Sequence, residues 1–402
     1  MAKKILRFAH LLVILTPLLL SACWDKVELE ERAYVISIGI DKYEANEKKD
    51  EDKKDSGKDK KSDEKKGTNE LDSEKDHDNI FLVSMSLPDL SSTGKDSGNE
   101  DVKSAVGKTI HSAIGSTDGF SGKKLYFGHT KLIVINEEIL KDEKLLRETL
   151  DAFERNDQVS GRAIVLSSES KAEKILETNP PSESMVGMFV SSFYRSGHNT
   201  AGASFKQDLT GIVRELRAKG STIIPKIELK GKELEIGGGA LISETKLNRW
   251  LTEDEMRGYL WSKKGKASGT VIEIEKDGTF LPLKVSKHKS NTFFSKTGDT
   301  IICQTDIKID GVLESFIFGE NPPDLKNLAK KYESVILSEI ANADENINLL
   351  EFEFLDEMKK TSSHLYNDYI NGEKDIEVAW NVDVRIVRTG NLINSKSIRP
   401  VR

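Results

Sequence analysis

Side chains with the chemistry for catalysis are few in this chain, and they are scattered. Seven histidines and two cysteines are spread over 402 residues, with no His-Glu-x-x-His metal motif and no Gly-x-Ser-x-Gly nucleophile elbow. Gly107-Lys108-Thr109 has the ending of a phosphate-binding loop, but Val102 stands where that motif needs glycine. For His129 we expect a hydrogen-bonded structural role at the start of a strand. The sequence therefore predicts a protein that is not an enzyme and needs no metal or cofactor.

Chemistry of a different kind is predicted at Cys23. Three basic residues precede an apolar run, residues 8–20, that is shorter than the ~20 residues needed to span a bilayer. Leu19-Leu20-Ser21-Ala22-Cys23 resembles a bacterial lipobox. That resemblance implies cleavage between Ala22 and Cys23, an S-diacylglycerol cysteine, and N-acylation of the new amino terminus with a palmitate-like chain. The alternative is an ordinary cleaved signal peptide with an incidental cysteine.

The rest of the chain must then work while tethered to a membrane. Two or three acyl chains hold a protein almost irreversibly, and no later segment approaches 18 consecutive apolar residues. After cleavage the chain carries 57 basic and 67 acidic residues, a net charge of −10, so we expect neither nucleic acid nor an anionic bilayer surface as a partner. Cys303 is then the one remaining thiol. We expect it as a small apolar residue on a strand, without a disulfide.

Two strands are predicted on either side of a long charged insert. Residues 34–41 are rich in β-branched side chains and predict a buried strand, and residues 79–87 also predict a strand. Residues 44–79 between them contain 24 charged residues in 36, 14 acidic and 10 basic. Such a segment cannot bury enough apolar surface to offset the entropy of ordering it. We therefore predict one hairpin whose tip is a disordered loop.

Helices and strands alternate in the remainder of the chain. Apolar spacing predicts a helix over 102–114, a strand over 132–135, a helix over 143–153, a strand over 162–166 and a short helix over 171–176. Further on, residues 325–340 show a helical stripe and residues 376–386 a strand with one apolar face. These elements predict an α+β fold of two or three domains, in which mixed or antiparallel sheets pack against amphipathic helices.

Domain boundaries follow from breaker residues such as Asn179-Pro180-Pro181-Ser182. We expect a signal peptide over 1–22, an N-terminal α+β domain over 23–180, a middle domain over 181–290 and a C-terminal α+β domain over 291–402. Two units, 23–220 and 235–402, are the alternative.

Three stretches in order resemble the Ger(x)C family, the lipoprotein C subunits of spore germinant receptors. They are Cys23-Trp24-Asp25 with the strand 34–41, then residues 121–131 leading into the strand 132–135, and more weakly residues 239–242 with Trp250-Leu251-Thr252. One departure is local, since Glu351-Phe352-Glu353 stands where the family often has a Gly-Phe-Gly-like turn.

The resemblance implies a subunit of a nutrient germinant receptor that acts in spore germination. It implies a location on the outer face of the spore inner membrane and two integral-membrane partners, an A subunit and a transporter-like B subunit that holds the nutrient. This chain would then scaffold the complex without binding a small ligand itself, with Trp24, Asp25 and Lys124 as partner contacts. The competing class is a solute-binding lipoprotein of an uptake system, which requires two lobes around one cleft.

Overall fold

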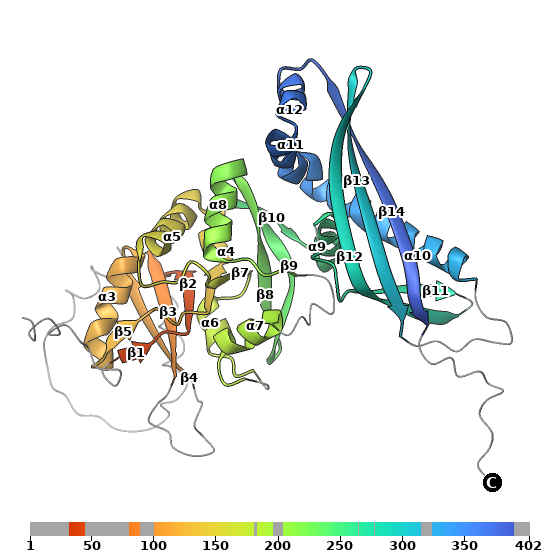
Figure 1. Cartoon of the computed structure of the whole chain (residues 1–402). Helices are drawn as coiled ribbons and strands as arrows, with labels where there is room; N and C mark the ends of the chain where they lie inside the picture. The colour runs from red at the N-terminus through yellow and green to blue at the C-terminus, as the bar shows by residue number, and fades with distance from the viewer. Residues whose placement is uncertain are drawn as a thin grey trace, which may run out of the picture.

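The computed structural model describes residues 32–44, 80–88, 100–180, 183–195, 204–263, 265–276, 278–314 and 324–389. Over these residues the chain forms two units, which lie side by side in Figure 1. The first unit is built on a broad mixed sheet and the second on a long, narrow one. Cys23, Trp24, Asp25 and nearly all of the charged insert lie outside the described residues.

The first sheet has eight strands in the order β10-β9-β8-β7-β6-β2-β3-β4. Its centre, β2, β6, β7 and β8, is parallel, and antiparallel strands flank it on both sides. The strands are β2 (Ser37–Lys42), β3 (Phe81–Pro88), β4 (Glu100–Gly107), β6 (Leu132–Asn136), β7 (Ile164–Ser168), β8 (Ser221–Lys230), β9 (Glu233–Ser243) and β10 (Lys246–Leu251). A separate two-stranded parallel sheet joins β1 (Arg32–Tyr34) to β5 (Lys124–Tyr126).

Helices cover both faces of the eight-stranded sheet, because the buried central strands are apolar on both sides. One core lies under α3 (Ile110–Ser121), α4 (Glu137–Lys141), α5 (Glu143–Arg155) and α8 (Leu209–Lys219). The opposite core lies under α6 (Ala172–Leu176) and α7 (Val186–Arg195). An α+β fold with amphipathic helices on a mixed sheet is thus confirmed.

The predicted hairpin around the charged insert is confirmed by the strand register. β2 and β3 are antiparallel, and Lys42 pairs with Phe81 at the end where the insert leaves and returns. The insert therefore begins and ends at neighbouring points on the sheet.

The predicted helix over residues 102–114 is wrong in its first half. Residues 100–107 form the edge strand β4, which pairs with β3 along its whole length, and the helix starts only after Thr109. The Thr109 side chain accepts from the Ser112 amide at 3.1 Å and so caps α3. Gly107 lets strand and helix meet, since a Cβ there would lie 2.5 Å from the Ala113 nitrogen.

A middle unit over residues 181–290 has no sheet of its own among the described residues. Strands β8, β9 and β10 hydrogen-bond into the first sheet, whereas β11 and β12 belong to the second. Asn179 and Pro180 lie between α6 and α7, which both pack on the first sheet. The proline cluster thus interrupts a unit and does not end one.

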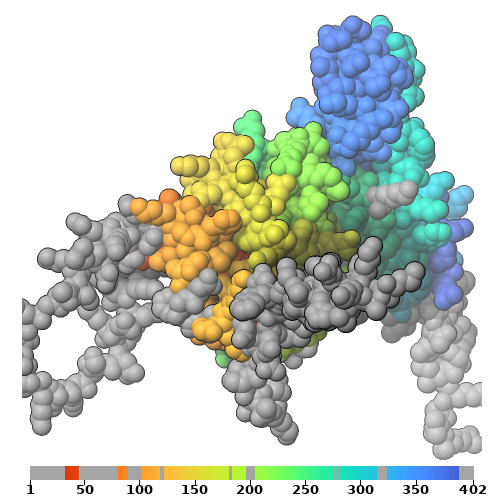
Figure 2. Space-filling view, turned by 60° about the vertical axis from the view of Figure 1, so that its left-hand side comes forward, coloured from red at the N-terminus to blue at the C-terminus, as the bar shows by residue number. Residues whose placement is uncertain are grey.

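The second unit is a four-stranded sheet in the order β11-β12-β13-β14, with only the last pair parallel. Its strands are β11 (Val271–Lys276), β12 (Thr279–Thr297), β13 (Thr300–Leu313) and β14 (Asp375–Thr389). Its helices are α9 (Glu253–Ser262), α10 (Leu325–Ile347), the π-helical turn η4 (Leu350–Phe354), α11 (Leu355–Thr361) and α12 (Ser363–Ile370). Figures 1 and 2 show α11 and α12 projecting beyond the first unit.

The predicted C-terminal helix and strand are both confirmed. Asp324 caps α10 by accepting from two backbone amides, and the stripe of Leu328, Tyr332, Ile336 and Ile340 is buried. Cys303 lies on β13, fully buried and free. Burial raises the pKa of its thiol to about 12, so the group stays protonated and unreactive.

The two units share one hydrophobic core. Phe205, Ile223 and Leu241 of the first unit pack in the same cluster as Trp261 and Tyr332 of the second. At the edge of this core, Lys219 of α8 donates to Glu353 of η4 at 3.1 Å, and Lys263 pairs with the same carboxylate. Burial alone would raise the pKa of Glu353, but the two lysines outweigh it and leave that pKa below its ordinary value.

Candidate functional site

Of the predicted partner contacts, the structure describes Lys124, on the short strand β5. Arg32, the first described residue, opens β1 nine residues after Cys23. β1 and β5 pair in parallel, with Arg32 opposite Lys124 and Tyr34 opposite Tyr126. The structure therefore brings together the beginning of the described chain and a segment about 90 residues further on.

Three aromatic rings cluster on this small sheet. The ring centres of Tyr34 and Tyr126 are 5.6 Å apart in an edge-to-face arrangement, and the His129 ring lies 5.4 Å from Tyr34 and 5.7 Å from Tyr126. The Arg32 guanidinium sits 4.9 Å above the Tyr126 ring, within cation–π range. His129 is exposed and packs through its ring. The structure thus shows ring contacts for His129, for which the sequence predicted a hydrogen-bonded structural role.

The sequence around Gly128 fixes this cluster in place. Leu125 and Phe127 are buried and hold the segment against the first unit, and the Thr130 amide donates to the Phe127 carbonyl at 2.9 Å to close a tight turn. A Cβ at Gly128 would lie 2.5 Å from the Tyr126 hydroxyl, so only glycine allows that ring its position. The Thr130 hydroxyl then donates to the Val35 carbonyl at 3.2 Å, which ties the turn to the chain leaving β1.

We define the basic aromatic surface as Arg32, Tyr34, Lys124, Tyr126 and His129. A shallow pocket of about 190 Å³ opens beside it, lined by Arg32, Lys124, Leu125, Tyr126 and Gln158. Half-buried tyrosine and arginine side chains on a rigid support, like Arg32, Tyr34 and Tyr126, are typical of the residues that dominate protein–protein interfaces. The surface is also cationic in a chain whose overall charge is negative. Its chemistry therefore suits docking to a partner.

Asp41 lies at the carboxyl end of the central strand β2, next to the place where an open α/β sheet would hold an anionic ligand. Its carboxylate accepts from the Ala172 amide at 2.7 Å and the Glu173 amide at 2.9 Å, so it caps α6. Asp41 is 1% exposed, and burial raises its pKa to about 6 in spite of the two amides. The protein's own carboxylate thus occupies the amides that an anion would use.

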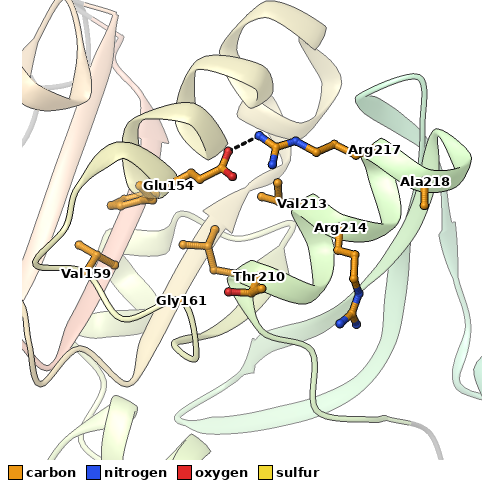
Figure 3. Close-up of a pocket in the computed structure, with 10 residues that line it drawn as sticks. Glu154, Val159, Gly161, Thr210, Val213, Arg214, Arg217 and Ala218 are labelled. Atoms are coloured by element: carbon orange, nitrogen blue, oxygen red, sulfur yellow. Dashed lines mark hydrogen bonds and ion pairs between the residues drawn. The ribbon is translucent and has the colours of Figure 1, made fainter.

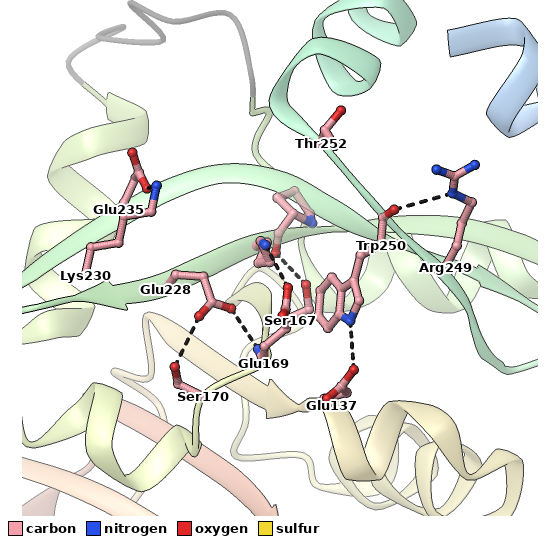
Figure 4. A network of polar contacts seen from close by, with 12 residues as sticks. Glu137, Ser167, Glu169, Ser170, Glu228, Lys230, Glu235, Arg249, Trp250 and Thr252 are labelled. Carbon is pink, nitrogen blue, oxygen red and sulfur yellow. Dashed lines mark hydrogen bonds and ion pairs between the residues drawn. The ribbon is translucent and has the colours of Figure 1, made fainter. Parts of the chain in front are cut away.

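The neighbouring strand ends carry a network of polar contacts, shown in Figure 4. Glu228 of β8 accepts from the Glu169 amide at 2.8 Å and from the Ser170 hydroxyl at 3.1 Å. Lys226 pairs with Glu169 at 2.9 Å and lies 5.3 Å from the centre of the Trp250 ring. These groups form hydrogen bonds and an ion pair with one another, and they link the end of β7 to β8.

Trp250 extends the network towards α4. Its indole N–H donates to Glu137 at 2.9 Å (Figure 4). Ser167 donates to the carbonyls of Ile224 and Pro225, at 3.0 and 3.2 Å, where the β8 register shifts. A protein that binds a small molecule at these strand ends would keep the crevice between them open. Here the chain's own side chains bridge it.

Two further properties hold for the part of the chain that the structure describes. No helix there is long and apolar enough to cross a membrane. No three His, Cys, Asp or Glu side chains there group closely enough to hold a metal ion.

Comparison with known proteins decides the family. The spore germination protein N-terminal domain matches residues 25–229, and the spore germination B3/GerAC-like C-terminal domain matches residues 237–390. The chain belongs to the Ger(x)C family of spore germination proteins. Ger(x)C proteins are germinant receptor C subunits, so membership supports a role in spore germination.

Individual Ger(x)C relatives are distant in sequence. Spore germination protein A3 of Bacillus subtilis (strain 168) is 23% identical over 279 residues, 68% of this chain and 65% of that protein, slightly under two thirds of its length. Spore germination protein KC of the same strain is 22% identical, covering 79% of this chain and 77% of that protein. The crystal structure of the GerBC protein aligns with a TM-score of 0.53 at 13% identity, covering 76% of this chain and 93% of that one. This likeness shows the fold.

The sequence predicted Lys124 as a partner contact, but it did not show that Arg32, Tyr34 and Tyr126 are its neighbours. A parallel pairing between distant segments leaves no local periodicity. One feature of the sequence could have indicated the contact. The two Ger(x)C-like stretches, 34–41 and 121–131, lead into β2 and β6, which are adjacent in the sheet.

Proposed function

We propose that this chain is the lipid-anchored C subunit of a nutrient germinant receptor, and that it docks through its first unit onto the integral-membrane A and B subunits. In this proposal the anchor is acylated Cys23, on the outer face of the spore inner membrane. The chain acts there by binding and positioning its partners, without chemistry of its own.

The observation that carries the proposal is the position of the basic aromatic surface. Arg32 follows Cys23 by nine residues, which even fully extended reach only ~30 Å. A chain anchored at Cys23 would therefore hold this surface close to the bilayer. Trp24 and Asp25 would lie in the connecting segment, at the same level as an integral-membrane partner.

The anchor is tested with Cys23→Ala. We expect this variant to lose incorporation of a palmitate analogue, to remain uncleaved by the lipoprotein peptidase, and to abolish germination through its receptor. Label that persists in the variant would refute the lipid attachment at this residue.

The docking surface is tested by reversing charge with Lys124→Glu and Asp25→Lys. We expect both to lower the amount of A subunit recovered with the protein while its melting temperature is unchanged. Lys330→Glu, on the exposed face of α10, makes the same charge change on the second unit and should have no effect. If Asp383→Lys on β14 lowers recovery and the first two variants do not, the second unit carries the interface.

A further inference from the structure

A groove of about 500 Å³ runs between α5, the loop that follows it, and α8 (Figure 3). Its floor is apolar and comes from Phe153, Val159, Leu209 and Val213. Gly161 brings the loop against α8, because a Cβ there would lie 2.3 Å from the Thr210 hydroxyl. The groove is therefore a built feature in which two helices are held apart by a tightly packed loop.

The rim of the groove is basic. Arg217 pairs with Glu154 at 2.6 Å and bridges α8 to α5 at one end, as Figure 3 shows. Arg214 is exposed and makes no hydrogen bond or ion pair with another described residue. The site thus offers apolar side chains at its base and one uncompensated positive charge at its edge.

The described chain begins next to this groove. Gln158 lines the pocket beside Arg32, and the following residue, Val159, lines the groove. Three residues before Arg32 stands Leu29, and five residues before it stands Val27. Extended chain reaches ~10 Å over three residues and ~17 Å over five, so both side chains can reach Val159 at the near edge of the groove.

The chemistry of that segment matches the groove. In Val27-Glu28-Leu29-Glu30 apolar and acidic residues alternate, and in extended chain such residues point to opposite sides. Leu29 and Val27 would face Val159 and Val213 while Glu28 and Glu30 face the basic rim. We propose that residues 27–31, between the anchor cysteine and β1, dock in the groove between α5 and α8.

Docking of this kind shortens the connection between anchor and protein. A segment seated in the groove brings Cys23 to the side of the first sheet that α5 and α8 cover, and fixes which face of the first unit meets the bilayer. It also makes residues 27–31 part of the first unit. The inference does not depend on the lipid or on the receptor partners.

Disulfide trapping in the full mature chain tests the docking of residues 27–31. The background carries Cys23→Ser, and Cys303 is buried, so the introduced cysteines are the exposed thiols. Leu29→Cys combined with Val213→Cys should cross-link at least tenfold faster than Leu29→Cys combined with Arg155→Cys. Arg155 lies at the end of α5, with its side chain 75% exposed, so an undocked segment would reach it as readily. Thr210→Cys, on the exposed lip of the groove, is a second partner should Val213→Cys fold poorly.

A second experiment tests the pairing of acidic residues of the segment with the basic rim. Arg214→Glu should slow the Leu29–Val213 cross-link, and adding Glu30→Arg should restore its rate. Equal rates for the groove pair and the Arg155 pair, or a groove rate indifferent to the charge at 214, would overturn the proposal. A photo-crosslinker at 213 that captures the A subunit in membranes, and not residues 27–31, would also overturn it and assign the groove to that partner.

Discussion

Replacement of Asp41 by asparagine probes the most unusual carboxylate of the first unit. Burial raises the pKa of Asp41 from 3.8 to about 6, which corresponds to ~3 kcal/mol, because each pKa unit is worth ~1.4 kcal/mol. The direction in which the free energy of unfolding changes with pH follows from the number of protons bound in each state. Between about pH 4 and pH 6 the folded state keeps a proton that the unfolded state has lost, so rising pH favours unfolding. Above about pH 6 both states are ionised and this contribution is constant.

Asparagine has the same shape and does not titrate. The free energy of unfolding of the wild type, minus that of Asp41→Asn, should therefore fall by ~3 kcal/mol between about pH 4 and pH 7. Urea denaturation at a series of pH values measures it. Asp142→Asn is the matched control, since Asp142 also accepts two backbone amides at a helix start but is exposed. A difference for Asp41→Asn that stays level or rises with pH would refute the reasoning, because the Ala172 and Glu173 amides would then stabilise the ion more than burial penalises it.

Three further substitutions and one deletion test individual features of the fold. Gly258→Ala should lower the free energy of unfolding by ~1–3 kcal/mol in denaturant titrations, because its Cβ would lie 2.1 Å from the Glu339 carbonyl of α10. Gly115→Ala is the control: this glycine faces open space on α3, and the substitution should raise the free energy of unfolding by ~0.5–1 kcal/mol. Thr252→Ala removes the capping box of α9 and should lower the free energy of unfolding by ~1 kcal/mol. Deletion of residues 46–77 should leave the thermal melting temperature within a few degrees, since the ends of this segment leave neighbouring strands, and a large drop would mean that it packs on the fold.

Elements with strong local signals were predictable from the sequence. The stripe of α10 and the alternation of β14 each repeat at the period of their own secondary structure, and each is confirmed. The β2–β3 hairpin was also predictable despite its long insert, because both strands are rich in apolar residues and the insert is almost devoid of apolar side chains.

Features that depend on distant pairing were not predictable. Residues 102–106 have spacing compatible with a helix, and only their position beside β3 makes them a strand. Strands β8 to β10 were assigned to a middle unit because nothing local shows that β8 continues the parallel order beside β7. Of the candidate site, the sequence indicated Cys23 and Lys124, whereas the contact of Arg32 with Tyr126 depends on the same kind of distant pairing.

The core shared by the two units has a mechanical consequence. Residues from β8, β9 and α9 pack with α10 in one cluster, and the Lys219–Glu353 pair ties α8 to η4, so the described residues hold the two units together at their junction. A displacement of the first unit would therefore also move α11 and α12. Because the second sheet is long, the movement at these helices would be larger than at the junction. The two units should accordingly lose their structure in a single thermal transition.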